Sequence, residues 1–132
     1  MKIIVELETD KLTSEALLQI IRQMDDESYL TEFAKHYDDT VKTEVAANPH
    51  TLPVDLDNLS KEDYFMIKWC VAANERTPES AILRLANDKD FLIRERISER
   101  YDLSDKVLMI LTRDEDDKIR ELALKKAKRR HI

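Results

Sequence analysis

Residues 67–94, IKWCVAANERTPESAILRLANDKDFLIR, begin and end with an aliphatic residue followed by a cation. The pair recurs along the chain at intervals of 26 residues: Val41-Lys42, Ile67-Lys68, Ile93-Arg94 and Ile119-Arg120. Three more apolar columns keep this interval: Val45, Val71, Ile97 and Ala123; Phe33, Leu59, Leu85 and Leu111; and Leu30, Leu56, Ile82 and Leu108. Columns that stay in register over this length predict an internal repeat whose units stack on one another.

Each unit has the apolar spacing of two helices. The longer helices are expected over residues 38–47, 62–73, 88–99 and 115–130, and the shorter ones over 27–35, 53–59, 78–87 and 104–112. Thr77 before Pro78 is a start signal for a shorter helix, and Ser60 with Asp63 can cap the longer helix that begins near residue 62. Because one helix pair cannot bury its own apolar face, we expect an all-α solenoid. It forms a single domain over residues 1–132, with an N-terminal arm and cap over 1–36 and repeats over 37–132.

The first 36 residues follow the repeat poorly. Residues 12–24 have a helical apolar pattern and predict a helix that caps the first repeat. Residues 1–8, from Met1 to Glu8, alternate through Ile3, Val5 and Leu7 and predict one short strand. A single strand leaves its backbone groups unpaired, so we expect either a homodimer through residues 1–8 or an extended arm packed on the helices.

Composition limits the classes of fold and location. Of the 132 residues, 42% are hydrophobic, 38% are charged and 6% are aromatic, which indicates a globular chain with a largely aliphatic core. Glycine is absent, which disfavours tight hairpins and the glycine-rich loops that bind nucleotides. No apolar run is long enough to span a membrane, and the N-terminus turns acidic too early for a secretory signal. The single cysteine, Cys70, cannot form an internal disulfide, which favours a cytoplasmic location.

Catalytic and metal-binding groups do not come together in the sequence. The three histidines, His36, His50 and His131, lack a metal-ligand spacing, and no cysteine pair supplements them. Cys70 is interpreted as an inert, half-buried thiol, with a thiolate activated by Arg96 as the alternative. Acidic pairs fall at the expected helix starts, where capping explains them. We therefore expect no enzyme, no cofactor and no metal site.

A family resemblance rests on residues 71–94. They carry an alanine, an asparagine, a threonine–proline pair, spaced leucines, an aspartate and an apolar–arginine pair. This pattern resembles the leucine-rich repeat variant family, a relative in architecture of HEAT and armadillo solenoids. The resemblance covers about residues 30–124 and implies alternating long and short helices in a right-handed superhelix. Some similar proteins carry a cysteine-ligated iron–sulfur domain in front, but Cys70 alone cannot hold a cluster. The resemblance therefore implies a fold and leaves the activity open.

The cations of the repeated pair have two interpretations. In three repeats an acid stands six residues before the cation: Glu62 before Lys68, Asp88 before Arg94, and Asp114 before Arg120. In HEAT-like solenoids, acidic and basic residues so placed resemble a ladder that ties adjacent repeats together. An acid in the first helical turn also complements the helix dipole. We expect this structural ladder; the alternative is a cationic stripe that binds phosphate.

The C-terminal segment is the one concentrated basic run. Residues 125–130 hold five lysines and arginines, and because the whole chain carries −6, the remainder carries −11. Cations in the last helical turn complement the helix dipole, but Lys125, Lys128 and Arg129 can also contact an acidic partner or nucleic acid. The acidic remainder of the chain disfavours a nucleic-acid partner, because it repels phosphate.

Trp69 stands in a column whose other members, Thr43, Glu95 and Glu121, are polar. A tryptophan there either covers the N-terminal helix or anchors a partner. Tyr64 and Phe65, with Met66, extend the same apolar region. The sequence thus predicts a non-catalytic protein–protein interaction module whose partner is unknown. The alternative is a nucleic-acid-associated protein that uses the basic C-terminal helix.

Overall fold

The computed structural model describes residues 13–132, and within this range the chain forms nine α-helices and no strand. The helices are α2 (Ser14–Arg22), α3 (Glu27–Phe33), α4 (Asp39–Ala47), α5 (Pro53–Leu59), α6 (Phe65–Ala73), α7 (Glu79–Ala86), α8 (Phe91–Ser98), α9 (Asp105–Leu111) and α10 (Asp117–Arg129). The prediction of an all-α chain is confirmed. The predicted strand and dimer contact at residues 1–8 lie outside the described residues. None of the helices in the described range is long and apolar enough to cross a bilayer.

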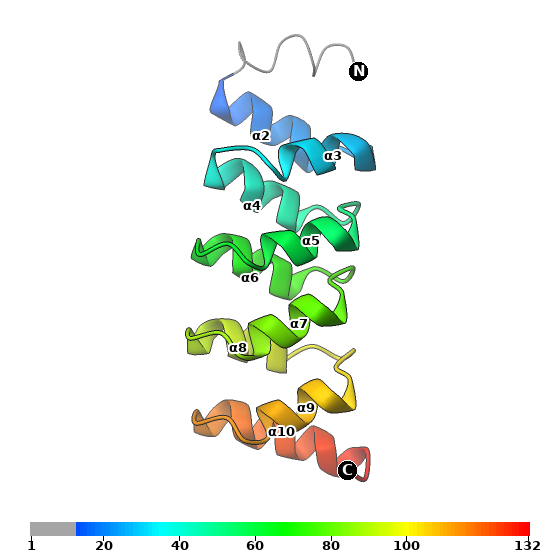
Figure 1. Ribbon diagram of the computed structural model, residues 1–132, viewed down its shortest axis with the longest axis vertical. Coiled ribbons are helices and arrows are strands. Elements are labelled where there is room, and N and C mark those ends of the chain that lie inside the picture. Colours follow the sequence, from blue (N-terminus) through cyan, green and yellow to red (C-terminus); the bar gives the residue numbers. More distant parts are fainter. Residues whose placement is uncertain (1–12) are drawn as a thin grey trace.

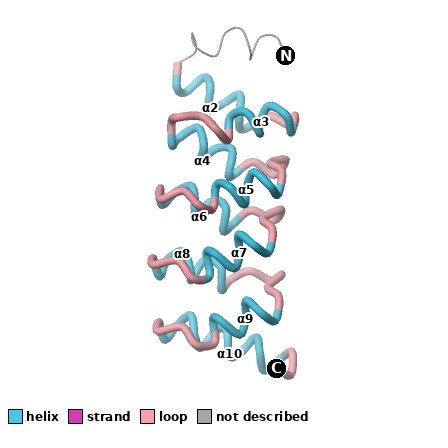
Figure 2. The backbone as a smooth tube through the Cα atoms, viewed as in Figure 1, coloured by secondary structure: helices cyan, strands magenta, loops and turns pink. Residues whose placement is uncertain are grey.

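The helices stack in pairs along the long axis of the molecule, from α2 and α3 at one end to α10 at the other (Figure 1). Each even-numbered helix packs against the next even-numbered helix, and α5, α7 and α9 pack on one another in the same way. The connecting loops gather along two edges of the stack (Figure 2). The helices α2 and α3 both pack on α4, and α2 lies within residues 12–24, where the sequence predicted a capping helix.

The apolar columns of the repeat form the core. Each even-numbered helix from α4 onward contributes its third residue, and none of these side chains is more than 3% exposed: Val41, Ile67, Ile93 and Ile119. The other three apolar columns are also buried and belong to the same cluster. Since every repeat places equivalent residues in one cluster, the core runs through the whole stack. The spacing read from the sequence therefore marks successive layers of this core.

Three even-numbered helices begin two to three residues later than predicted. Helix α8 starts at Phe91 rather than near residue 88, and α6 starts at Phe65 rather than near residue 62. The reason is visible before α8, where the Asp88 carboxylate accepts a hydrogen bond from the backbone nitrogen of Asp90 at 2.9 Å. Asp90 then caps the helix by accepting from the backbone nitrogen of Leu92 at 2.9 Å. These side chains take backbone donors in a turn, which postpones the helix.

An ion-pair ladder joins consecutive repeats. The first three cations each bind the acid of the following repeat, 20 residues later, rather than the acid six residues before the cation. The pairs are Lys42–Glu62 at 2.8 Å, Lys68–Asp88 at 2.9 Å and Arg94–Asp114 at 2.9 Å. The last two are nearly buried, and the Asp114 contact raises the pKa of Arg94. Removing one member of such a pair costs about 3–5 kcal/mol, because the other charge is left buried.

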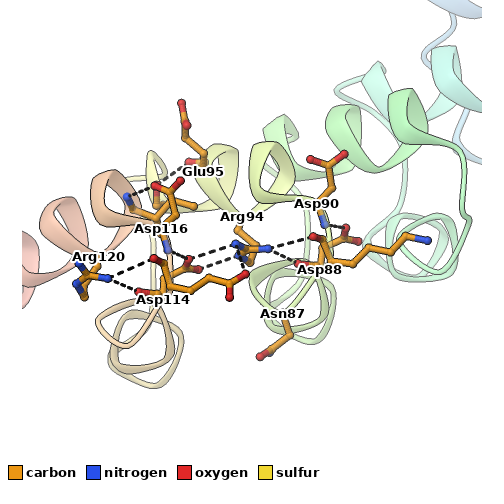
Figure 3. Close-up of polar contacts among 12 residues, drawn as sticks. Asn87, Asp88, Asp90, Arg94, Glu95, Asp114, Asp116 and Arg120 are labelled. Carbon is orange, nitrogen blue, oxygen red and sulfur yellow. Dashed lines mark hydrogen bonds and ion pairs between the residues drawn. The ribbon is translucent and has the colours of Figure 1, made fainter.

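The acids of the ladder lie ahead of the helices and not in their first turns. Figure 3 shows Arg94 between Asp88 and Asp114. Its Nη1 donates to the backbone carbonyl of Asp88 at 2.9 Å, while its Nε donates to the Asp114 carboxylate. Arg120 repeats the first contact, donating to the Asp114 carbonyl at 2.8 Å, and its ion pair is with Asp117 in its own helix. The cations therefore form ion pairs and hydrogen bonds within the stack. This leaves no unpaired cation in this column for the alternative of a phosphate-binding stripe.

A second polar column closes the C-terminal ends of the even-numbered helices. We call it the carbonyl-capping column, and its members stand 26 residues apart: Asn48, Asn74, Arg100 and Lys126. Each side chain donates to two backbone carbonyls at the end of the preceding even-numbered helix, over 2.6–3.0 Å. The last carbonyls of a helix lack partners within it, so the following repeat completes each helix. Burial, followed by the charge of Arg130, lowers the pKa of Lys126.

The replacement Asn74→Ala tests this column. It leaves the buried carbonyls of Ala46 and Asn48 without the Asn74 amide donor, so we expect a loss of about 1–3 kcal/mol in the free energy of unfolding. Urea denaturation followed by circular dichroism measures this loss. Asn58→Ala is the matched control, because Asn58 is exposed. Equal changes in the two variants would contradict the role of the column.

Candidate partner-binding surface

Apolar side chains gather on the exposed faces of α6 and α8. Tyr64 and Met66 are each 42% exposed, and Phe91 and Leu92 are 48% and 41% exposed. Phe65 and Trp69 are half-buried and pack against the edge of the core. We call these six residues the apolar patch: Tyr64, Phe65, Met66, Trp69, Phe91 and Leu92. The structure thus brings together the three aromatic residues that the sequence singled out and adds two residues from the next repeat.

Trp69 contacts residues of both helices that form the apolar patch. Its ring stacks on Phe65 with centroids 5.7 Å apart and an angle of 29° between the planes. The guanidinium carbon of Arg96, from α8, lies 5.7 Å from the centroid of the tryptophan ring. A cation over an aromatic face adds about 0.5–1 kcal/mol at an exposed site. Trp69 is therefore held by its own repeat and by the next one.

Two residues of the apolar patch, Trp69 on α6 and Leu92 on α8, hold repeat positions that form an ion pair one repeat later. One repeat later, Glu95 and Lys118 hold the positions that correspond to Trp69 and Leu92, and they form an ion pair at 3.2 Å. Residues at these two positions therefore meet across neighbouring helices. Between α6 and α8 the same positions carry two apolar side chains in place of two charges.

The patch is confined to the two middle repeats. At the first position of the even-numbered helices, α4 and α10 have aspartate, whereas α6 and α8 have phenylalanine: Asp39, Phe65, Phe91 and Asp117. At the second position the residues are Thr40, Met66, Leu92 and Lys118. The repeat therefore does not need apolar residues here. Exposed apolar clusters that the fold does not require mark interaction sites.

Tyr64 occupies a place where the repeat otherwise uses aspartate. Asp38, Asp90 and Asp116 cap α4, α8 and α10 by accepting backbone hydrogen bonds. Among the even-numbered helices in residues 13–132, only α6 has an N-cap residue, Tyr64, whose side chain makes no capping bond. A missing cap costs about 0.5–2 kcal/mol. The predicted caps Ser60 and Asp63 do not fill this role, and Ser60 donates to the Asp57 carbonyl at 2.5 Å. Tyr64 therefore makes the start of α6 less stable than a capping aspartate would.

The basic C-terminal segment divides into structural and free cations. Lys126 belongs to the carbonyl-capping column, and the Arg130 guanidinium donates to the carbonyl of Leu103. Lys125, Lys128 and Arg129 are exposed and form no ion pair with any other residue of the described range. These three residues, which the sequence named as candidates, lie on α10 and are separated from Trp69 by α8. Among the lysines and arginines of residues 125–130, these three are therefore the ones available to a ligand.

Cys70 has the properties of an inert thiol. It is partly buried, and burial together with the negative charge of Glu44 raises its pKa above the ordinary value. The neighbouring cation that was considered as an activator, Arg96, instead lies over Trp69. A raised pKa disfavours the nucleophilic thiolate form. These observations disfavour the alternative of a thiolate activated by Arg96.

The replacement Tyr64→Asp should stabilise the protein. It restores the capping carboxylate that α4, α8 and α10 possess, so we expect the free energy of unfolding to rise by about 0.5–2 kcal/mol. The reciprocal variant Asp90→Tyr removes the cap of α8 and should lower it by a similar amount. Chemical denaturation measures both. A destabilised Tyr64→Asp variant would show that the tyrosine supports the fold.

Comparison of the chain with models of protein families, with curated proteins and with solved structures gives no match. The assignment of a function therefore rests on the residues of the apolar patch and on their geometry.

Proposed function

We propose that this protein is a non-catalytic interaction module, built as a right-handed HEAT-like α-solenoid, that binds another protein through the apolar patch. The observation that carries the proposal is the departure of α6 and α8 from their own repeat. Six residues at four positions of the repeat carry aromatic and aliphatic side chains, whereas α4 and α10 carry polar residues at these positions. Tryptophan and tyrosine are enriched among the residues that dominate binding energy at protein interfaces. The resemblance of residues 71–94 to leucine-rich repeat variant proteins belongs to this proposal.

Association with nucleic acid through the basic C-terminal helix is the weaker alternative. Lys126 and Arg130 are held by backbone carbonyls, which leaves Lys125, Lys128 and Arg129 for phosphate. Three phosphate contacts would lower the affinity roughly 40-fold between 50 and 200 mM salt. Binding through the apolar patch should change much less over this range. The salt dependence of binding therefore separates the two functions.

The replacement Met66→Glu should weaken partner binding without unfolding the protein. Met66 is 42% exposed, so a carboxylate there remains solvated in the free chain but is buried unpaired in the complex. The partner is first recovered by affinity purification with the intact chain. We expect the affinity of the variant for this partner to fall about 30-fold, which corresponds to roughly 2 kcal/mol. Met109→Glu is the matched control, since Met109 is also 42% exposed but lies on α9. Equal recovery of the partner by both variants would contradict the proposal.

The homodimer through residues 1–8 stays a prediction. We expect light scattering to give twice the monomer mass for the intact chain and the monomer mass for a version that lacks Met1 to Glu8. The physical reason is that an extended segment pairs its backbone groups most readily with its own copy. A monomeric intact chain would show that the prediction is wrong.

A further inference from the structure

The even-numbered helices from α4 onward begin along one edge of the stack (Figure 1). The segments that lead into them are residues 36–40, 62–66, 88–92 and 114–118. Together these segments hold ten acids and two lysines, Lys89 and Lys118. The ladder cations pair with three of the acids, and Arg120 pairs with a fourth, Asp117. Six acids remain against the two lysines, so this edge of the stack carries a net negative charge.

Acids flank the apolar patch on both of its sides. In the column of Phe65 and Phe91, the members on the neighbouring helices α4 and α10 are both aspartate. We define the acidic rim as three residues around the patch that form no ion pair with any other residue of 13–132: Asp39 on α4, Asp63 directly before the patch, and Glu121 on α10. Asp63 and Glu121 are exposed, and Asp39 is half-buried. The rim therefore keeps three carboxylates whose charge the fold does not use.

The cations nearest the apolar patch are engaged elsewhere. Arg96 lies over the Trp69 ring and pairs with Glu99 at 3.4 Å. Lys118 pairs with Glu95 at 3.2 Å. Neither of these pairs includes a member of the acidic rim. The rim carboxylates are thus left for a group that the chain itself does not supply.

A partner that covers the apolar patch brings its own residues next to the acidic rim. Carboxylates there would be repelled, and apolar groups would remove water from the rim without pairing its charges, whereas lysine or arginine forms ion pairs with it. We infer that the partner binds through a basic, apolar segment of its chain. Its apolar side chains contact the apolar patch, and lysine or arginine on either side of them pairs with the acidic rim. This inference rests on the proposed function and names the chemistry of the partner.

The charge of the whole chain acts in the same direction. The formal net charge is −6, and the basic run over residues 125–130 lies toward the C-terminal end of α10, away from the edge where the helices begin. The field around the apolar patch is therefore negative. Such a field attracts a basic segment and raises its rate of association.

Selection from a displayed library of random peptides of about 20 residues, with the intact chain as bait, tests this inference. We expect enriched peptides to carry aromatic or aliphatic residues flanked on both sides by lysine or arginine. A rim variant with Asp39→Asn, Asp63→Asn and Glu121→Gln should bind the most enriched peptide about fivefold more weakly, because exposed ion pairs each contribute little. The same peptide with its cations replaced by glutamine should bind the unchanged chain and the rim variant equally. Fluorescence anisotropy measures these affinities.

A matched control removes three carboxylates elsewhere, through Asp25→Asn, Glu32→Gln and Glu79→Gln. All three residues are exposed and form no ion pair with any other residue of the described range. The control changes the net charge by the same amount as the rim variant, so it separates the rim from the charge of the whole chain. It should bind the most enriched peptide as the unchanged chain does.

The outcomes separate the inference from the proposed function. Enriched peptides without flanking cations, or the same affinity in the rim variant and the control, overturn the inference and leave the function standing. A chain with Met66→Ser and Leu92→Ser that selects the same peptides as the unchanged chain overturns both. Self-association that survives removal of residues 1–8 but is lost with Met66→Ser and Leu92→Ser assigns the patch to a second copy of the chain, which also overturns the inference.

Discussion

The stack depends on how the C-terminal end of each even-numbered helix is closed. The last carbonyls of a helix have no partner within it, and burying them without a donor is costly. Here two of them accept hydrogen bonds from the next member of the carbonyl-capping column. The ion-pair ladder also joins one repeat to the following one, near the other end of these helices. Each repeat is therefore completed by its neighbour, which explains why one helix pair is not a stable unit alone.

This coupling assigns four positions of an even-numbered helix before any function is considered. The third and seventh positions enter the core, and the fourth carries the ladder cation. The eighth is small in α4, α6 and α8, where neighbouring helices pack closely: Ala46, Ala72 and Ser98. The first, second and fifth positions carry none of these roles, and they are the positions where the apolar patch departs from the repeat. A repeat protein thus separates residues that hold the fold from residues that are free to bind.

The departure at Tyr64 has an energetic meaning. Aspartate at the same position caps α4, α8 and α10, whereas α6 has a tyrosine there that makes no capping hydrogen bond. Binding surfaces commonly retain residues that reduce stability, because the contact with a ligand needs them. The missing cap of α6, beside Phe65 and Trp69, fits a surface shaped by binding.

The sequence by itself determined the all-helical fold, the 26-residue unit and the buried columns, because apolar spacing directly reports which face of a helix is covered. It also marked Trp69, since the other members of that column are polar, and comparing Phe91 and Leu92 with their columns would have added them. The partners of the polar columns were decided only by the tertiary structure. Asp88 is close in sequence to Arg94, yet it pairs with Lys68, because the distance between side chains depends on how repeats stack. For the same reason Lys126, which reads as one cation in a basic run, is a structural donor to the carbonyls of α8 and its following loop.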